Sequence, residues 1–223
     1  MVCRCGVVAW VAGLTLGLSC SGAVEPSAGR PSDGVNAAPL TRMYHKQRLP
    51  LTLDATRLAV RADAALVVKA AAAAGLTKVT LMDAVLPGWW LLPLPAATTQ
   101  QEVEKFVGVL AQQPGVERVS PVFIDDLGGP AWVAGDLLIG FGSDQTAAAR
   151  DAVIAQTKCG ELRQRDYTPG VDRIVPGSRN GLEILAAANA LAMRDDVLFA
   201  EPDWAFTGRS QVIPNDLFFG DLW

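Results

Sequence analysis

From about Leu49 onward, hydrophobic and polar positions follow two recurring patterns. Segments in which apolar and polar residues alternate predict strands, because successive side chains of a strand point to opposite faces, whereas apolar runs with helical spacing predict helices. The elements expected in the first half of the chain are a strand at 57–61, a helix at 64–74, strands at 78–82 and 89–94, a helix at 100–112 and a strand at 116–124. Their order is β-α-β-β-α-β.

Local start and stop signals support these boundaries. Gly75 can end the first helix, because glycine readily adopts the left-handed conformation that closes many helices. Thr98 or Thr99 can cap the second helix, and Glu102 lies three residues beyond Thr99, which is the spacing of a capping box. A Pro-Gly pair then ends that helix.

The second half of the chain repeats this order. Ser143 or Asp144 can cap its first helix and Asn180 its second. The elements expected there are a strand at 136–141, a helix that runs through Lys158, strands at 161–166 and 171–175 joined by a turn at 168–170, a helix at 182–193 and a strand at 197–204.

The two closing strands share residues at matching positions. Val116 and Pro121 correspond to Val197 and Pro202 at an offset of 81 residues, without a gap. A unit of roughly 80 residues is therefore expected to have been duplicated in tandem.

These patterns predict an α+β fold with two tandem ferredoxin-like (βαββαβ) units, one at 49–127 and one at 128–206. Each unit is expected to have a four-stranded antiparallel sheet with two helices on one face, which leaves the other face bare or offers it to a partner. Trp89 and Trp90 are neighbours on a predicted strand, so they should point to opposite faces. One of them is expected in the core and the other is a candidate contact residue, although packing in the core or at the sheet edge is the more common position for both.

The N-terminal residues have the pattern of an export signal at 1–23. Arg4 supplies a positive charge, and an apolar run follows at 7–18. This run is shorter than the roughly 20 residues that span a bilayer. Cys20 could instead be a lipoprotein acceptor. We expect the chain to be secreted or periplasmic, with a flexible tether at 24–48 that is rich in Pro, Gly, Ser and Ala at its start.

The composition fits a folded chain that has no strong net charge with which to attract a charged partner. Of the 223 residues, 50% are hydrophobic, and 19 Lys plus Arg stand against 23 Asp plus Glu, for a formal net charge of −4. This charge gives no electrostatic reason to expect nucleic acid as a partner. The sequence contains neither a Walker phosphate loop nor a Gly-x-Ser-x-Gly elbow.

The few cysteines and the single histidine limit metal and catalytic chemistry. Removal of the signal leaves Cys159 without a cysteine partner for an intramolecular disulfide. His45 lies in a polar stretch with no orienting acid or nucleophile beside it, which favours a surface position. One histidine excludes a multi-histidine metal site, and we expect no cofactor and no metal. The acid pairs at 125–126 and 195–196 are expected to be solvated turn residues.

Three segments resemble parts of secreted bacterial subtilisin-like serine proteases. Residues 214–223 (PNDLFFGDLW) resemble the start of the mature catalytic domain, where a Pro-Asn-Asp-Pro stretch and an aromatic residue precede a Trp, although Leu217 replaces the second proline. Residues 197–204 (VLFAEPDW) resemble the closing strand of the family's prosegments, and residues 49–60 resemble the opening of these prosegments.

This resemblance implies that the chain is a prosegment. Prosegments of the family are βαββαβ domains that dock their sheet on the protease, assist its folding and inhibit it through an extended C-terminal tail. Residues 207–223 would then be a linker and the start of a protease domain. The chain stops before the Asp, His and Ser segments of the family, so we expect no catalysis by this chain.

The resemblance also implies which residues would contact the catalytic domain of a subtilisin-like protease. Glu201 or Asp203 could cap the N-terminus of a protease helix. An extended peptide can add as a strand to the edge of a cleft. The residues expected in the protease cleft are Ala205, Phe206, Thr207, Gly208, Arg209, Ser210 and Gln211.

Two other functions remain open from the sequence. The chain could be a stand-alone secreted inhibitor that acts on a separate subtilisin-like protease. It could also be a tandem ligand-binding module in the cell envelope, because small-ligand modules of this shape have weak sequence signatures.

Overall fold

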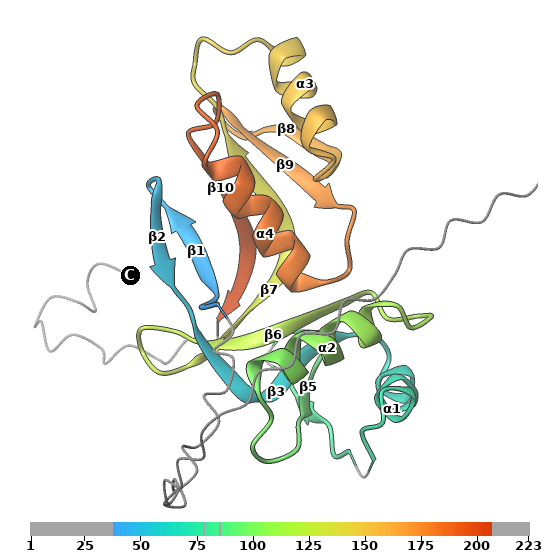
Figure 1. Cartoon of the computed structure of the whole chain (residues 1–223). Coiled ribbons are helices and arrows are strands. Elements are labelled where there is room, and N and C mark those ends of the chain that lie inside the picture. Colours follow the sequence, from blue (N-terminus) through green and yellow to red (C-terminus); the bar gives the residue numbers. More distant parts are fainter. Residues whose placement is uncertain (1–37, 78, 85, 207–223) are drawn as a thin grey trace, which may run out of the picture. The chain divides into compact units, whose positions relative to one another are not determined.

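The computed structural model describes residues 38–206 except residues 78 and 85. The predicted export signal, Cys20, the first part of the predicted tether and residues 207–223 lie outside the described residues. The described part is an α+β structure, as predicted (Figure 1). Its elements in chain order are β1 (Thr41–Tyr44), β2 (Gln47–Pro50), β3 (Thr52–Arg61), α1 (Ala64–Ala73), β4 (Met82–Asp83), β5 (Trp89–Pro93), α2 (Gln100–Ala111), β6 (Arg118–Ile124), β7 (Pro130–Gly140), α3 (Ala147–Thr157), β8 (Gly160–Thr168), β9 (Val171–Pro176), α4 (Gly181–Ala192) and β10 (Phe199–Phe206).

Eight strands form one antiparallel sheet. Seven of them follow the order β4-β5-β3-β6-β7-β9-β8, and β10 pairs with β7. The sequence predicted two separate four-stranded sheets, and the structure differs because β6 and β7 join them. Phe123 lies opposite Ala131 and Ile124 opposite Pro130 in this pair.

The strand boundaries differ from the predicted ones where strands gain or lack partners. Strand β7 was predicted to begin at residue 136, but its first residues pair with β6 and with the end of β10, so it begins at Pro130. Strand β4 has only two residues, Met82 and Asp83, where a strand at 78–82 was predicted. Its one pairing partner is β5 in the described part of the chain.

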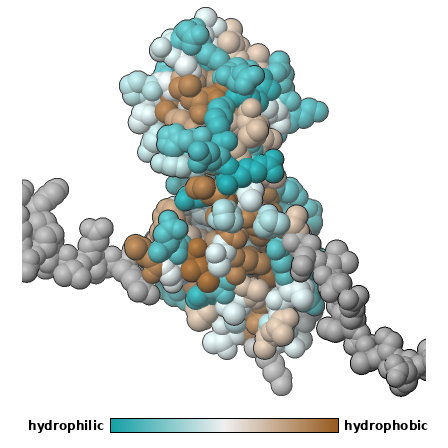
Figure 2. All heavy atoms as spheres, turned by 60° about the vertical axis from the view of Figure 1, so that its left-hand side comes forward, coloured by the Kyte–Doolittle hydropathy of each residue, from teal (hydrophilic) through white to brown (hydrophobic). Residues whose placement is uncertain are grey.

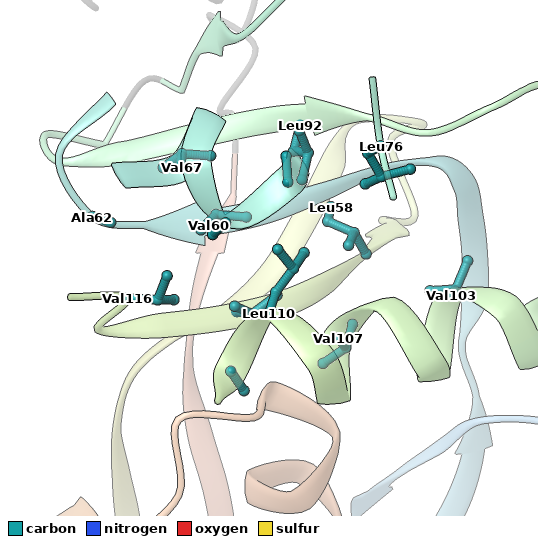
Figure 3. Packing of buried hydrophobic residues seen from close by; sticks show 14 residues of the cluster. Leu58, Val60, Ala62, Val67, Leu76, Leu92, Val103, Val107, Leu110 and Val116 are labelled. Atoms are coloured by element: carbon teal, nitrogen blue, oxygen red, sulfur yellow. The ribbon is translucent and has the colours of Figure 1, made fainter. Parts of the chain in front are cut away.

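Helices α1 and α2 bury the first core against the sheet. Leu58 and Val60 of β3 and Leu92 of β5 meet Val107 and Leu110 of α2, and all five side chains are fully buried (Figure 3). Burial of such side chains supplies the main favourable term in folding. The predicted capping box at the start of α2 is confirmed.

Helices α3 and α4 belong to a second core, whose buried residues include Leu137, Ile139 and Ile174. Asn180 caps α4, as predicted, and its Oδ1 accepts from the Leu182 amide at 2.9 Å. The predicted caps of α3 were wrong, since Thr146 is the cap rather than Ser143 or Asp144. The reason is a turn at 142–145, in which the Gln145 amide donates to the Gly142 carbonyl at 3.0 Å before the helix begins.

Strands β1 and β2 form a hairpin inside the stretch predicted to be a tether. Only Met43 of its strand residues is buried, and it joins the second core. Asn189 of α4 fixes the hairpin, because its Oδ1 accepts from the Met43 amide at 2.8 Å and its Nδ2 donates to the Thr41 carbonyl at 2.7 Å. The tether prediction therefore does not hold for residues 41–48.

Candidate docking surface

Strand β7 covers one face of the first half of the sheet. Trp132, which is 1% exposed, packs from β7 against a buried cluster that includes Ala59, Trp89 and Val122. The ring centroids of Trp89 and Trp132 are 6.0 Å apart. Since α1 and α2 cover the other face, the centre of this half of the sheet is covered on both sides.

The two adjacent tryptophans of β5 both pack within the chain. Trp89 is buried beside Trp132, and Trp90 points to the opposite face, as predicted for neighbours on a strand. Trp90 is half-buried against the first core, and its Nε1 donates to the Ala62 carbonyl at 3.1 Å. Both tryptophans therefore contact other residues of this chain, and neither remains as a candidate contact with a partner.

The second half of the sheet keeps one face partly exposed. Leu137 and Ile139 of β7 point into the second core, so Leu138 between them points to the other side. Leu138 lies between Glu201 of β10 and Arg173 of β9 in the strand register. All three of the residues in this row remain partly exposed. We call the face that they mark the open face.

Two glycines of β7 allow side chains of β10 to lie close to its backbone. A Cβ atom on Gly140 would clash with the Phe199 ring, and a Cβ atom on Gly135 would clash with the Asp203 side chain. Phe199 therefore covers a position of β7 that has no side chain of its own.

A buried carboxylate, that of Asp136, binds the arginines that form the basic side of the open face. Asp136 is 5% exposed, and its Oδ2 accepts from Arg163 Nη1 at 2.9 Å and from Arg173 Nε at 2.7 Å. Arg118 donates to the neighbouring Gly135 carbonyl. Burial lowers the pKa of Arg118 below its usual range, and the charge of Asp136 opposes that shift. Three arginines around one aspartate leave an excess of positive charge here.

The acidic side of the open face lies on β10, which pairs only with β7 among the described strands. Glu201 is partly exposed and Asp203 is exposed. Within residues 38–206, neither carboxylate has a hydrogen-bonding or ion-pair partner. Both residues that the sequence singled out as capping candidates thus remain without a polar partner in the described part of the chain.

The predicted protease-binding tail is described only at its start. Ala205 and Phe206 belong to β10 and lie opposite Trp132 and Ala131 of β7. The remaining tail residues, Thr207, Gly208, Arg209, Ser210 and Gln211, lie outside the described part of the chain. The structure therefore brings Glu201, Asp203, Ala205 and Phe206 together on one strand.

A groove of about 320 Å³ lies beside the end of β10. In Figure 2, hydrophobic residues (brown) gather in the lower part of the described surface, and hydrophilic residues (teal) dominate its upper part. The groove is lined by Arg42, Leu49, Pro50, Leu51, Thr52, Phe123, Ile124, Asp125, Asp126, Ala131, Trp204 and Phe206.

A buried ion-pair network links α3 to the hairpin of β8 and β9. Asp172 is fully buried, and its carboxylate lies 3.5 Å from Arg150 Nη1 and 3.0 Å from Arg165 Nη1. Arg150 also donates to Asp166 at 2.8 Å, and this hydrogen bond lowers the pKa of the Asp166 carboxyl. The network neutralises its own charges, so we assign it a structural role.

The residues that the sequence singled out as possible catalytic or metal-binding groups lie far apart in the structure. His45 is exposed in the turn of the β1–β2 hairpin, and Cys159 is a free, buried cysteine of the second core. Asp125 accepts the amides of Leu127 and Gly129 in the turn between β6 and β7, which fits a turn acid. No cluster of His, Cys, Asp and Glu within the described residues could hold a metal ion.

Sequence reasoning missed the basic side of the open face. Arg163 and Arg173 lie on two strands of the predicted hairpin, and Asp136 begins another predicted strand. The alternation of side chains along each strand could have assigned each of these three residues to one face of the sheet. The pairing of these residues depends on strand register, and the sequence alone does not fix that register.

No family model matches the chain, and no curated protein matches it. Among the described residues, no helix combines the length and the apolar character that crossing a membrane requires.

Proposed function

We propose that this chain is a secreted or periplasmic prosegment of a subtilisin-like serine protease. In this proposal it assists the folding of the catalytic domain and inhibits it, and it does so by docking the open face and the tail after β10. It performs no catalysis and needs no cofactor. The proposal rests on the sequence resemblance together with the geometry of the second half of the sheet.

The strand order supports a tandem ferredoxin-like architecture. Numbered within each half of the chain, the first half has the order 4-1-3-2 in β6-β3-β5-β4. The second half has the same order in β10-β7-β9-β8. Two halves with the same element order and the same strand order are what tandem duplication of one βαββαβ unit produces.

The single observation that carries the proposal is the difference between the two halves. Trp132 covers the outer face of the first half, whereas Leu138, Arg173 and Glu201 stay partly exposed on the second. Only the second half can therefore offer the centre of its sheet to a protease. Its last strand also leads directly into the predicted tail, so one docking event can position both.

The charges on the open face favour a protein partner of mixed polarity. The carboxylates of Glu201 and Asp203, which have no polar partner among the described residues, suit positively polarised groups, such as the N-terminus of a helix. Apolar Leu138 lies between this acidic border and Arg173. A polar rim around an apolar centre is typical of protein interfaces.

Inhibition of subtilisin-like proteases tests this function. The full chain is added to a panel of bacterial subtilisin-like proteases, and hydrolysis of a chromogenic peptide is followed. We expect inhibition of at least one protease, and at least a tenfold weaker inhibition by the double variant Glu201→Arg/Asp203→Arg, because charge reversal at an interface costs about 1.4 kcal/mol or more.

Asp195→Arg is the matched control for this experiment. Asp195 is an exposed acid in the turn between α4 and β10 and is not part of the sheet, so its reversal should leave inhibition unchanged. A chain that inhibits no protease of the panel would overturn the proposed function. Equal weakening by the control and the β10 variant would instead refute the role of the open face.

A further inference from the structure

The groove beside β10 has an aromatic floor that becomes more exposed toward the end of the described chain. Phe123, 1% exposed, meets Trp204 edge to face at a centroid distance of 5.7 Å. Trp204 in turn stacks on Phe206 at 6.5 Å, and Phe206 is 54% exposed. The series of rings therefore ends on an open apolar surface, where a further aromatic side chain could pack.

The walls of the groove come from strand ends that are far apart in the sequence. Leu49, Pro50 and Leu51 lie on one wall, at the end of the β1–β2 hairpin, and Ile124 lies at the end of β6. Ile124 is 43% exposed, although it is large and apolar. An apolar occupant would remove both Ile124 and Phe206 from water.

We propose that this groove binds a segment of the same chain, residues 217–223 (LFFGDLW). The described chain ends at Phe206, which lines the groove, so the segment is covalently tethered to the groove by the residues between. Twelve positions separate Phe206 from Phe218, and at about 3.5 Å per residue that length is ample for the chain to turn back. The segment carries five large apolar residues, and three of them are aromatic.

The groove lining carries one cation, Arg42, and two acids, Asp125 and Asp126, so apolar contact rather than charge must hold this occupant. The segment has one acidic residue, Asp221, with Asp216 directly before it, and Arg42 supplies a cationic group on the groove wall. Asp125, also on the lining, is already engaged by the amides of Leu127 and Gly129 at 2.9 and 2.6 Å. Binding of the segment in cis would keep the predicted tail looped beside β10.

Photo-crosslinking of the full chain tests this inference without any protease. Phe218 is replaced by the photo-reactive analogue p-benzoylphenylalanine, and the crosslinked peptides are identified by mass spectrometry. We expect intramolecular crosslinks to the groove residues, at 49–52 or at 123–124. The variant Ile124→Ser should reduce their yield severalfold, because it removes apolar surface from the groove wall.

Leu127→Ser is the matched control, since Leu127 is 68% exposed in the adjacent turn and does not line the groove. It should leave the crosslinks unchanged. Crosslinks to the same residues of a second copy would overturn binding in cis and indicate exchange between molecules. Crosslinks elsewhere, or none, would overturn the proposal, and none of these results depends on protease inhibition.

Discussion

At the scale of single residues, the charges buried in this fold are few and each has a defined partner. Asp172 is the most buried carboxylate of the ion-pair network, and it also accepts from the Asp166 amide at 3.1 Å. Asp151, at the edge of the same network, pairs with Arg165 but is 60% exposed. The network thus offers a buried and an exposed acid that share one arginine.

Removal of Asp172 should destabilise the chain far more than removal of Asp151. We expect Asp172→Ala to lower the free energy of unfolding by about 3–5 kcal/mol, because it leaves Arg150 and Arg165 short of a buried counter-charge. Asp151→Ala should change it by less than about 1 kcal/mol, as is usual for exposed pairs. Urea denaturation of both variants measures the difference, and equal losses would contradict the structural role of the network.

At the scale of secondary-structure elements, the hairpin of β1 and β2 depends on α4. Asn189 contributes both hydrogen bonds that fix Met43 and Thr41. Lys46 adds two more, because its Nζ donates to the carbonyls of Arg194 and Val197 at 2.5 and 2.7 Å. A cation at this position also suits the C-terminal end of a helix.

The variant Asn189→Ala should loosen the hairpin, which the bonds of Lys46 still hold at its turn, while the rest of the fold persists. It leaves the Met43 amide and the Thr41 carbonyl without their partner, and because both hydrogen bonds are only partly buried we expect a loss of about 1 kcal/mol for each. Hydrogen exchange followed by mass spectrometry should show faster exchange at 41–50 and little change in α2. Arg48→Ala, at an exposed position of β2, is the control and should leave exchange at 41–50 unchanged.

Elements whose signals are local could be predicted, and the hairpin could not. The capping box of α2 involves only Thr99 and Glu102, so the sequence was sufficient to place it. The hairpin has mostly polar strand residues, and its partner Asn189 lies 146 positions from Met43. Residues at such separation leave no periodic pattern, and a polar stretch without a period resembles a tether.

At the scale of the whole molecule, the order of elements could be predicted but the joining of the halves could not. The repeat fixed the sequence of strands and helices within each half. The covering of Trp89 by Trp132 depends on how β7 crosses from one half to the other, and no local pattern encodes that. The candidate surface shows the same limit of local patterns. The sequence placed Glu201 and Asp203 on the closing strand, but it did not predict that the outer face of the first half would be covered.

Several contacts join the two halves besides the pairing of β6 with β7. The Val119 amide donates to the Arg179 carbonyl at 2.9 Å, and the Val133 amide donates to Ser120 Oγ at 3.1 Å. A Cβ atom on Gly181 would come within 2.8 Å of Ser120, so α4 begins in close contact with β6. Because these contacts add to the buried Trp132 cluster, the halves should unfold together.

The variant Trp132→Ala should weaken this coupling. It opens a cavity between the halves, so we expect a loss of about 3–5 kcal/mol in the free energy of unfolding. The parent chain should unfold in one calorimetric transition, whereas the variant should show two, because the first half loses the side chain that covers its outer face. Tyr167→Ala is the control: Tyr167 is 47% exposed and its ring centroid lies 5.4 Å from Arg173 Cζ, so one transition should remain. Two transitions in the parent chain would show that Trp132 does not couple the unfolding of the halves.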